Sequence, residues 1–294
     1  MISVTEALDR LFALTSPLPV EEVTLTGAHG RALAAPVTAR RDQPPFAASA
    51  MDGYAVAGSA AAGAAYEVIA EAAAGRGTDR SVGAGEAVRI FTGAPLPQGA
   101  DTVVIQEDVT REGTRITVTE ATGAGANVRP AGDFRIGDRI EAPRLISPSD
   151  IALMAAMNVP RVTVARRPVV ALIPTGDELV QPGEEPGPDQ IVASNSYGLH
   201  ALLTAAGAEV RLLPIARDRM DALETVMRLA SGADLVVTIG GASVGDHDLV
   251  AQAAQGIGME QAFYKVAMRP GKPLMAGRLG DAAMIGLPGN PVSA

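Results

Sequence analysis

The feature that most constrains this chain is a regular alternation of short apolar runs and helical stretches after residue 168. The apolar runs are rich in β-branched residues and cover residues 168–174, 208–215 and 234–240. Helical patterns lie between and after them, near residues 195–206, 219–231 and 247–255. Such alternation is typical of a parallel sheet covered by helices on both faces. Two further runs, QAFYKVAM and AAMIGLP, are expected to add strands to this sheet.

A polar motif follows each of these five predicted strands. In chain order, the motifs are PTGDEL, RD, GGASVGDHD, RPGKP and LPGNP. In open α/β sheets, the ligand crevice lies outside the carboxyl ends of the strands. We therefore expect the five loops to meet at one edge of the sheet and to form a binding site there.

The loop GGASVGD suggests an anion-binding turn. Gly240, Gly241 and Gly245 would let the backbone approach an anion closely and present N–H groups at a helix start, and Ser243 adds a hydroxyl. An ordinary strand–helix turn explains the glycines equally well. The loop is not a Walker A motif, because no Gly-Lys-Ser/Thr ends it.

Carboxylates are concentrated in two of the loops. Asp177 and Glu178 follow the first strand, and Asp246 and Asp248 follow the third. Oxygen ligands of this kind suit a hard cation such as Mg²⁺. Each carboxylate alone is better explained as a helix cap or a solvated charge, whereas two pairs beside a phosphate loop favour a metal site. The histidines show no metal-ligand spacing and are expected to be structural: His29, His200 and His247.

Lysine is almost absent from the chain. Of the 24 basic side chains, only Lys265 and Lys272 are lysines, and both lie in the stretch YKVAMRPGKP with Arg269 between them. An ammonium is a mobile point charge, whereas a guanidinium is a rigid planar fork. The lysines therefore suit a phosphate or a tetrahedral oxyanion that must be held and then released. The alternative is that two surface charges lie close together by chance.

Composition limits the class of protein. With 294 residues, 47% of them hydrophobic, the chain can form about two domains. A net charge of −9 argues against a protein that binds nucleic acid by general attraction to phosphate. The absence of cysteine excludes disulfides, thiol nucleophiles and Cys-ligated metals, and fits a cytoplasmic protein. We find neither a signal peptide nor an apolar run of about 18 residues, so no membrane span is expected.

The first half has a different pattern. Ser3 and Glu6 have capping-box spacing and begin an amphipathic helix, and SPSDIALMAAMNV predicts a second capped helix. Between the two helices, short β-like runs divided by glycine and proline predict a β-rich domain at about 45–135. Two loops of this domain carry polar residues: Asp52 in SAMDGYAV, a loop that enters the domain, and Thr92 in FTGAPLPQGAD.

The motifs SAMDGYAV, TGAPLPQGADTVV, NVRPAGD, PTGDEL, GGASVGDHD, RPGKP and GLPGNPVSA occur in this order along the whole chain. In this respect the sequence resembles the MoeA family of molybdopterin molybdenumtransferases. The resemblance implies an α/β multidomain protein with a helical linker domain (1–44 plus 136–167), an inserted β-rich domain (45–135) and a MogA-like parallel α/β domain (168–294). Family members continue into a C-terminal β-domain, so the chain is expected to be truncated, with its α/β domain incomplete.

The resemblance also implies an activity: insertion of molybdate into adenylyl-molybdopterin, with Mg²⁺-dependent release of AMP. The residues expected to be catalytic are Asp52, Thr92, Glu178, Asp218, Asp248, Lys265 and Arg269. Those expected to bind the pterin substrate are Arg129, Thr175, Gly176, Gly240, Gly241, Ser243, Gly245, Lys272, Pro288, Gly289, Asn290, Pro291 and Ser293. The expected metal ligands are Asp177, Glu178, Asp246 and Asp248.

The sequence departs from the family pattern at two places. Gly132-Asp133-Phe134 stands where the family commonly has Gly-Glu-Asp, which leaves Asp133 as the candidate replacement for the missing carboxylate. Arg269 stands where many relatives have lysine.

The resemblance further implies a homodimer whose site is shared between subunits, with a MogA-like adenylyltransferase and apo-molybdoenzymes as partners. Two other functions are considered. A MogA-like adenylyltransferase would share the α/β domain, but the inserted β-rich domain argues against it. A non-catalytic dimeric scaffold, as in the E-domain of gephyrin, would not need the acidic and basic loops.

Overall fold

The structure is a computed structural model that describes residues 1–241 and 248–293. The chain forms two compact units. The first, here called the α/β unit, comprises Met1–Glu22, Gly30–Ala34 and Thr163–Ala294. The second, here called the β-rich unit, comprises Val23–His29 and Ala35–Val162.

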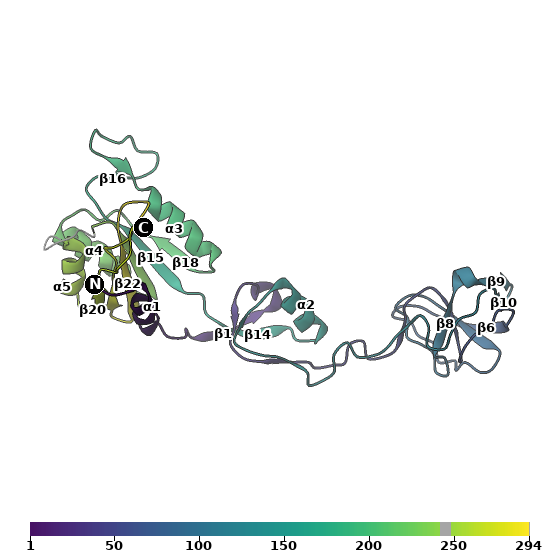
Figure 1. Ribbon diagram of the computed structural model, residues 1–294. Helices are drawn as coiled ribbons and strands as arrows, with labels where there is room; N and C mark the ends of the chain where they lie inside the picture. The colour runs from purple at the N-terminus through teal and green to yellow at the C-terminus, as the bar shows by residue number, and fades with distance from the viewer. Residues whose placement is uncertain (242–247, 294) are drawn as a thin grey trace. The chain divides into compact units, whose positions relative to one another are not determined.

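The α/β unit is built on a six-stranded sheet with the order β18-β15-β19-β22-β21-β20 (Figure 1). Its first four strands are parallel, as predicted, whereas β21 runs antiparallel to both of its neighbours. The strands are β15 (Val169–Pro174), β18 (Glu209–Leu212), β19 (Leu235–Ile239), β20 (Met259–Tyr264), β21 (Met275–Leu279) and β22 (Ala282–Leu287).

The sheet is therefore parallel as predicted except at β21, a strand that the sequence analysis missed. The cause is a tight turn at Gly280, whose φ of 58° lets Leu279 pair directly with Ala282. Because β20 and β22 are both antiparallel to β21, they run in the same direction. The carboxyl end of β20 thus lies at the same edge of the sheet as those of the parallel strands.

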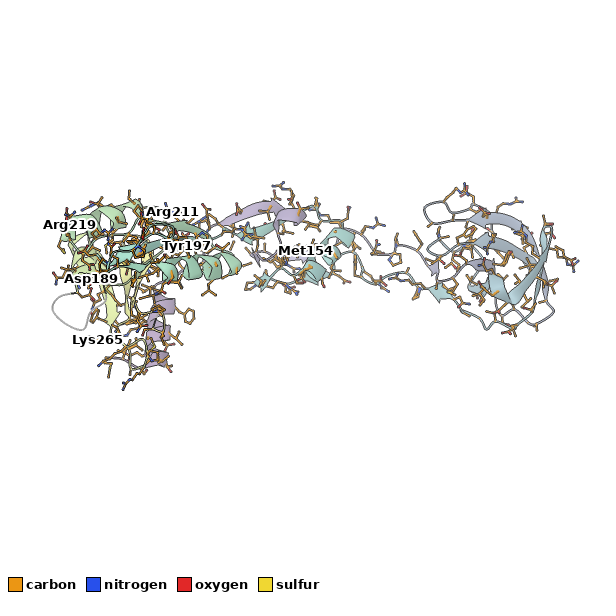
Figure 2. The ribbon with its side chains drawn as sticks, turned by 90° about the horizontal axis from the view of Figure 1, so that it is seen from above. Met154, Asp189, Tyr197, Arg211, Arg219 and Lys265 are labelled. Atoms are coloured by element: carbon orange, nitrogen blue, oxygen red, sulfur yellow. The ribbon has the colours of Figure 1, made fainter. Side chains whose placement is uncertain are left out.

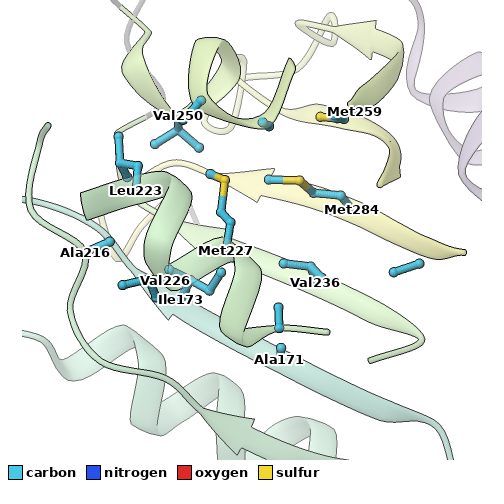
Figure 3. Packing of buried hydrophobic residues seen from close by; sticks show 14 of the residues in the cluster. Ala171, Ile173, Ala216, Leu223, Val226, Met227, Val236, Val250, Met259 and Met284 are labelled. Carbon is cyan, nitrogen blue, oxygen red and sulfur yellow. The ribbon is translucent and has the colours of Figure 1, made fainter. Parts of the chain in front are cut away.

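The predicted helices are confirmed within a few residues: α3 (Ser194–Ala205), α4 (Met220–Leu229) and α5 (Leu249–Gly256). Alternate residues of β15 pack on opposite faces of the sheet. Leu172 belongs to a cluster with Leu203 of α3, whereas Ile173 lies in the larger core with Leu223 and Met227 of α4 (Figure 3). The sheet is therefore buried on both faces, as the β-branched runs predict.

The N-terminal helix α1 (Val4–Ala13) has only half of the predicted capping box. Ser3 Oγ accepts a hydrogen bond from the Glu6 backbone N–H at 3.1 Å, but the Glu6 carboxylate pairs with Arg10 at 2.6 Å instead of returning to the cap. Ala7 is buried against Phe263 of β20. Helix α1 therefore belongs to the α/β unit, while the domain boundaries expected for the linker segments remain a prediction.

The β-rich unit contains a six-stranded sheet with the order β8-β5-β7-β6-β10-β9. Alternate residues of β5, the second strand in this order, pack into different clusters: Tyr54 and Val56 into one, Ala55 into the other. SAMDGYAV was expected to be a loop, but half of it forms this strand. The strands are β5 (Gly53–Val56), β6 (Ala65–Ala72), β7 (Glu86–Ile90), β8 (Thr102–Ile105), β9 (Val109–Glu112) and β10 (Arg115–Val118).

The second predicted helix is confirmed as α2 (Pro148–Ala156), with a complete capping box between Ser147 and Asp150. The remaining elements are short: β1 (Val20–Thr24), η1 (Leu25–Gly27), β2 (Ala32–Leu33), β3 (Val37–Thr38), β4 (Ala48–Ser49), η2 (Gln106–Asp108), β11 (Val128–Arg129), β12 (Arg139–Ile140), β13 (Arg144–Leu145), β14 (Arg161–Ala165), β16 (Leu179–Val180) and β17 (Ile191–Val192). Among the described residues, no helix has the length and apolar character needed to cross a membrane.

Candidate active site

The loops that follow the parallel strands of the α/β unit meet at the carboxyl edge of the sheet. The backbone N–H of Thr175 donates to the carbonyl of Ile239 at 2.9 Å, which joins the loop after β15 to the end of β19. The N–H of Gly176 donates to the carbonyl of Ala216 at 3.0 Å, which joins the same loop to the segment after β18. The predicted convergence of these loops is thus formed by backbone hydrogen bonds.

Glycine is required where these loops touch. Gly240 has a φ of 103°, and a Cβ there would lie 2.4 Å from the carbonyl oxygen of Thr175. A Cβ on Gly241 would lie 2.2 Å from Cγ2 of Val250. Gly289 approaches Gly240 so closely that its Cβ would be 3.3 Å from the Gly240 Cα. These glycines therefore serve close backbone packing. Three predicted residues of this loop, Ser243, Gly245 and Asp246, lie outside the described residues.

Three predicted acidic residues lie on adjoining loops. The Asp218 backbone N–H donates to Oδ1 of Asp177 at 3.2 Å. Burial raises the pKa of Asp218, and the negative charges of Asp177 and then Glu178 raise it further. The side chains of Asp177 and Glu178 are exposed to solvent, whereas that of Asp248 is buried. The loops thus hold like charges close together.

Arg217, which the sequence analysis did not single out, binds the backbone of the acidic loop that carries Asp177 and Glu178. Its Nη1 donates to the carbonyls of Gly176, Asp177 and Leu179, at 3.3, 2.9 and 3.1 Å. A guanidinium suits this role because its donors are fixed in a plane. The only signal in the sequence was its place beside Asp218 in the RD motif.

A small pocket of about 50 Å³ opens beside Glu178. The start of α3 forms one wall, where Nδ2 of Asn195 donates to the carbonyl of Gly289 at 2.9 Å. The predicted residues Thr175, Gly289 and Pro291 also line it, whereas sequence analysis missed the other residues of this wall: Ile191, Val192, Ala193, Ser194, Asn195 and Ser196. In the final loop, Oδ1 of Asn290 accepts the N–H of Val292 at 3.0 Å.

Asp248, expected to be a catalytic residue and a metal ligand, is only 5% exposed. Its Oδ1 accepts the N–H of Ala251 at 2.9 Å and caps helix α5. Its Oδ2 accepts the hydroxyl of Tyr264 at 2.6 Å. Burial raises the pKa of Tyr264, and the bond to the Asp248 carboxylate and its charge raise it further. Both oxygens of Asp248 are therefore used in bonds that stabilise the fold.

The basic loop follows directly. Lys265 is half-buried at the end of β20, with Nζ 5.1 Å from the centre of the Tyr264 ring (Figure 2). Its φ of 78° is in the left-handed region, and its N–H donates to the carbonyl of Leu274 at 2.9 Å. Arg269 and Lys272 are exposed. The stretch singled out by its lysines therefore forms a folded turn beside Asp248.

The β-rich unit brings together two of its predicted residues. Oδ1 of Asp52 accepts both the N–H of Thr92, at 2.8 Å, and its hydroxyl, at 2.7 Å. These two bonds lower the pKa of Asp52, and the positive charge of Arg89 lowers it further. Arg129 forms an ion pair with Asp133. Asp133, the candidate replacement for the family's missing carboxylate, thus neutralises a predicted substrate-binding residue.

No group of three or more acidic or histidine side chains that could hold a metal ion occurs among residues 1–241 and 248–293. Asp177 and Glu178 supply oxygen ligands of the type that Mg²⁺ prefers. The fourth predicted ligand, Asp246, lies outside the described residues.

One prediction concerns Asp218. Because its pKa is raised above the ordinary value of 3.8, the folded protein binds this proton more readily than the unfolded chain. The free energy of unfolding therefore falls as the pH rises through the raised pKa. We expect Asp218→Asn to be more stable than the wild type at pH 7, with a difference that shrinks as the pH is lowered toward 3.8.

Urea unfolding at a series of pH values measures this difference. The exposed Asp189 serves as the matched control (Figure 2), and Asp189→Asn should leave the stability unchanged. A lower stability of Asp218→Asn at pH 7 would contradict the explanation by burial and charge repulsion.

A mainly parallel sheet with acidic and glycine-containing loops at its carboxyl edge, in one chain with a β-rich unit that has its own polar cluster, defines a multidomain α/β protein. Two family descriptions match the chain: the MoeA N-terminal region (domain I and II) over residues 2–158, and the probable molybdopterin binding domain over residues 171–294. The chain belongs to the MoeA family.

Curated relatives agree with this assignment. The molybdopterin molybdenumtransferase of Nostoc sp. is 39% identical over the whole chain, which covers 71% of that relative, and that of Haemophilus influenzae is 35% identical, with 74% covered. The crystal structure of a molybdopterin biosynthesis MoeA protein from Pyrococcus horikoshii matches all of this chain and 76% of its own, with a TM-score of 0.83 and 31% identity. The predicted class, a transferase of molybdenum cofactor biosynthesis, is thereby confirmed.

Proposed function

We propose that the protein inserts molybdate into adenylyl-molybdopterin and releases AMP when the phosphoanhydride bond is cleaved. The observation that carries this proposal is the crowding of Asp177, Glu178 and Asp218 at the carboxyl edge of the sheet, where burial, and then repulsion by the other two carboxylates, raise the pKa of Asp218. Such charge is expected where a site is completed by cations and a substrate. The relatives named above supply the substrate class.

The residues present suit the two anions of this reaction. Lys265, Arg269 and Lys272 provide cations for molybdate and for the phosphates of the pterin substrate. Asn195, near the start of α3, extends the same site toward Gly289. Tetrahedral oxyanions and phosphates are both stabilised by donors that are oriented in advance.

Mg²⁺ is proposed as the cofactor, with Asp177 and Glu178 as its ligands among the described residues. Asp246 remains a predicted ligand, whereas Asp248 has both oxygens engaged by Ala251 and Tyr264. When bound, Mg²⁺ would neutralise charge on the phosphoanhydride oxygens.

A homodimer with a site shared between subunits is proposed for the assembly. The exposed Thr92 beside Asp52 supports it, because the β-rich unit thereby offers a polar cluster of its own to a substrate. A MogA-like adenylyltransferase would supply the substrate, apo-molybdoenzymes would receive the product, and the reaction would take place in the cytoplasm.

The test is AMP release from adenylyl-molybdopterin, measured by chromatography with Mg²⁺ and with or without molybdate. We expect release that depends on molybdate, and transfer of active cofactor to an apo-molybdoenzyme. Glu178→Gln should lower the rate roughly a hundredfold, the loss typical for removal of one catalytic group. AMP transfer from ATP to molybdopterin would instead identify an adenylyltransferase.

The exposed Glu185 provides the control, because it lies near Glu178 in the chain but outside the pocket. Glu185→Gln should retain the wild-type rate. Equal rates for wild type and Glu178→Gln would exclude Glu178 from the chemistry.

A further inference from the structure

Arg89 lies at the centre of the polar cluster in the β-rich unit, although no sequence motif singled it out. It lies on β7 opposite Tyr54 of β5. Its Nη1 donates to the carbonyl of Gly53 at 2.9 Å, and its Nη2 donates to Oε1 of Gln106 at 2.7 Å. Gly53 belongs to β5, and Gln106 is the first residue of η2, directly after β8, so a single guanidinium joins both segments to β7.

Two aromatic rings fix the orientation of this guanidinium. Its central carbon lies 4.5 Å from the centre of the Phe91 ring and 5.1 Å from that of Tyr54. Guanidinium–aromatic contacts of this length are attractive, and they stabilise one rotamer of a long side chain. Lysine could not reproduce the arrangement, because it lacks the planar fork that reaches two acceptors at once.

Both groups that Arg89 holds lie next to Asp52 in the structure. Gly53 is its neighbour in the chain, and the backbone N–H of Gln106 donates to the Asp52 carbonyl at 3.0 Å. The backbone at Gly53 is tightly packed, since a Cβ there would lie 2.0 Å from the carbonyl oxygen of Val104. Arg89 therefore fixes the backbone on both sides of the Asp52 side chain, through Gly53 and Gln106. Thr92 fixes the carboxylate itself through two hydrogen bonds.

We propose that Arg89 is a positioning residue that holds Asp52 and Thr92 in the geometry used by the reaction without touching the substrate. This role rests on the proposed function, in which Asp52 and Thr92 complete the site. Arg89 acts in two ways: its fork fixes the backbone of Asp52, and its charge favours the ionised carboxylate.

Two substitutions separate these actions. Arg89→Lys keeps the charge and loses the fork, whereas Arg89→Met loses both. Both variants are expected to lower kcat for molybdate-dependent AMP release by roughly tenfold to a hundredfold, the range typical of a catalytic group displaced by about 1 Å. KM for adenylyl-molybdopterin should change less than kcat. Arg115→Met, an exposed arginine on β10 of the same sheet, should keep both constants.

The second measurement does not depend on activity. The pKa of the Asp52 carboxyl group, followed by NMR with ¹³C-labelled aspartate, should rise in Arg89→Met and stay near the wild-type value in Arg89→Lys. If the wild type releases no AMP, the proposed function fails while the NMR titration still tests the effect of Arg89 on Asp52. Wild-type kcat in folded Arg89→Lys, or an unchanged pKa in Arg89→Met, would overturn the proposal.

Discussion

Replacement of Gly240 by alanine is expected to lower the free energy of unfolding of the α/β unit by at least about 3 kcal/mol. Two causes add. A φ of 103° is strained for any residue with a Cβ, and the Cβ would also lie 2.4 Å from the carbonyl oxygen of Thr175. Thr175 cannot move away easily, because its own N–H is bonded to Ile239.

Gly232 is the matched control. Its φ is 76°, but nothing lies within 4 Å of the position that a Cβ would take. Gly232→Ala should therefore cost only the backbone strain, about 1 kcal/mol. Urea unfolding followed by circular dichroism measures both losses. Equal losses in the two variants would show that the contact with Thr175 is relieved at little cost.

The second large effect is expected at Asp248. Asp248→Ala removes the cap of α5, worth about 1 kcal/mol, and also the charged acceptor of the Tyr264 hydroxyl, a hydrogen bond worth about 1.5–3 kcal/mol. Asp248→Asn keeps one acceptor oxygen for the N–H of Ala251, while its amide N–H can donate to the Tyr264 hydroxyl oxygen, so it should lose clearly less. Thermal and urea unfolding of both variants measure the difference.

A double-mutant cycle with Tyr264→Phe completes this test. If the 2.6 Å hydrogen bond carries the effect, the two losses should be non-additive by about 1 kcal/mol or more. Activity should fall together with stability in Asp248→Ala. A stable but inactive Asp248→Asn would instead restore the direct catalytic role that the resemblance implies.

Secondary structure was largely predictable from the sequence, because strand and helix patterns depend on local periodicity. The limits of α3, α4 and the parallel strands follow directly from the runs of apolar residues. Strand β21 was missed because its partners are set by the turn at Gly280 and not by its own pattern. For the same reason, the antiparallel direction of β21 in an otherwise parallel sheet could not be predicted.

The site was predictable in its residue types but not in its bonds. The motifs indicated Asp177, Glu178 and Asp218, whose crowding the structure shows. Sequence spacing could not show that Asp248 is buried against Tyr264, because the two lie on different elements of the fold. Arg217 and Arg89 were missed for a related reason: each acts through side-chain hydrogen bonds to backbone carbonyls, which leave no motif in the sequence.

The glycine contacts between Gly240, Thr175 and Gly289 bear on how this protein can change during evolution. Where loops touch backbone to backbone, an insertion or a larger residue in one loop displaces its neighbours as well. A change in the length of one loop would therefore disturb the whole site, and we do not expect substrate preference to change in this way. An exposed side chain such as that of Asn290 is free of this constraint. Divergence in substrate preference should accumulate at such positions, while the backbone of the site stays the same.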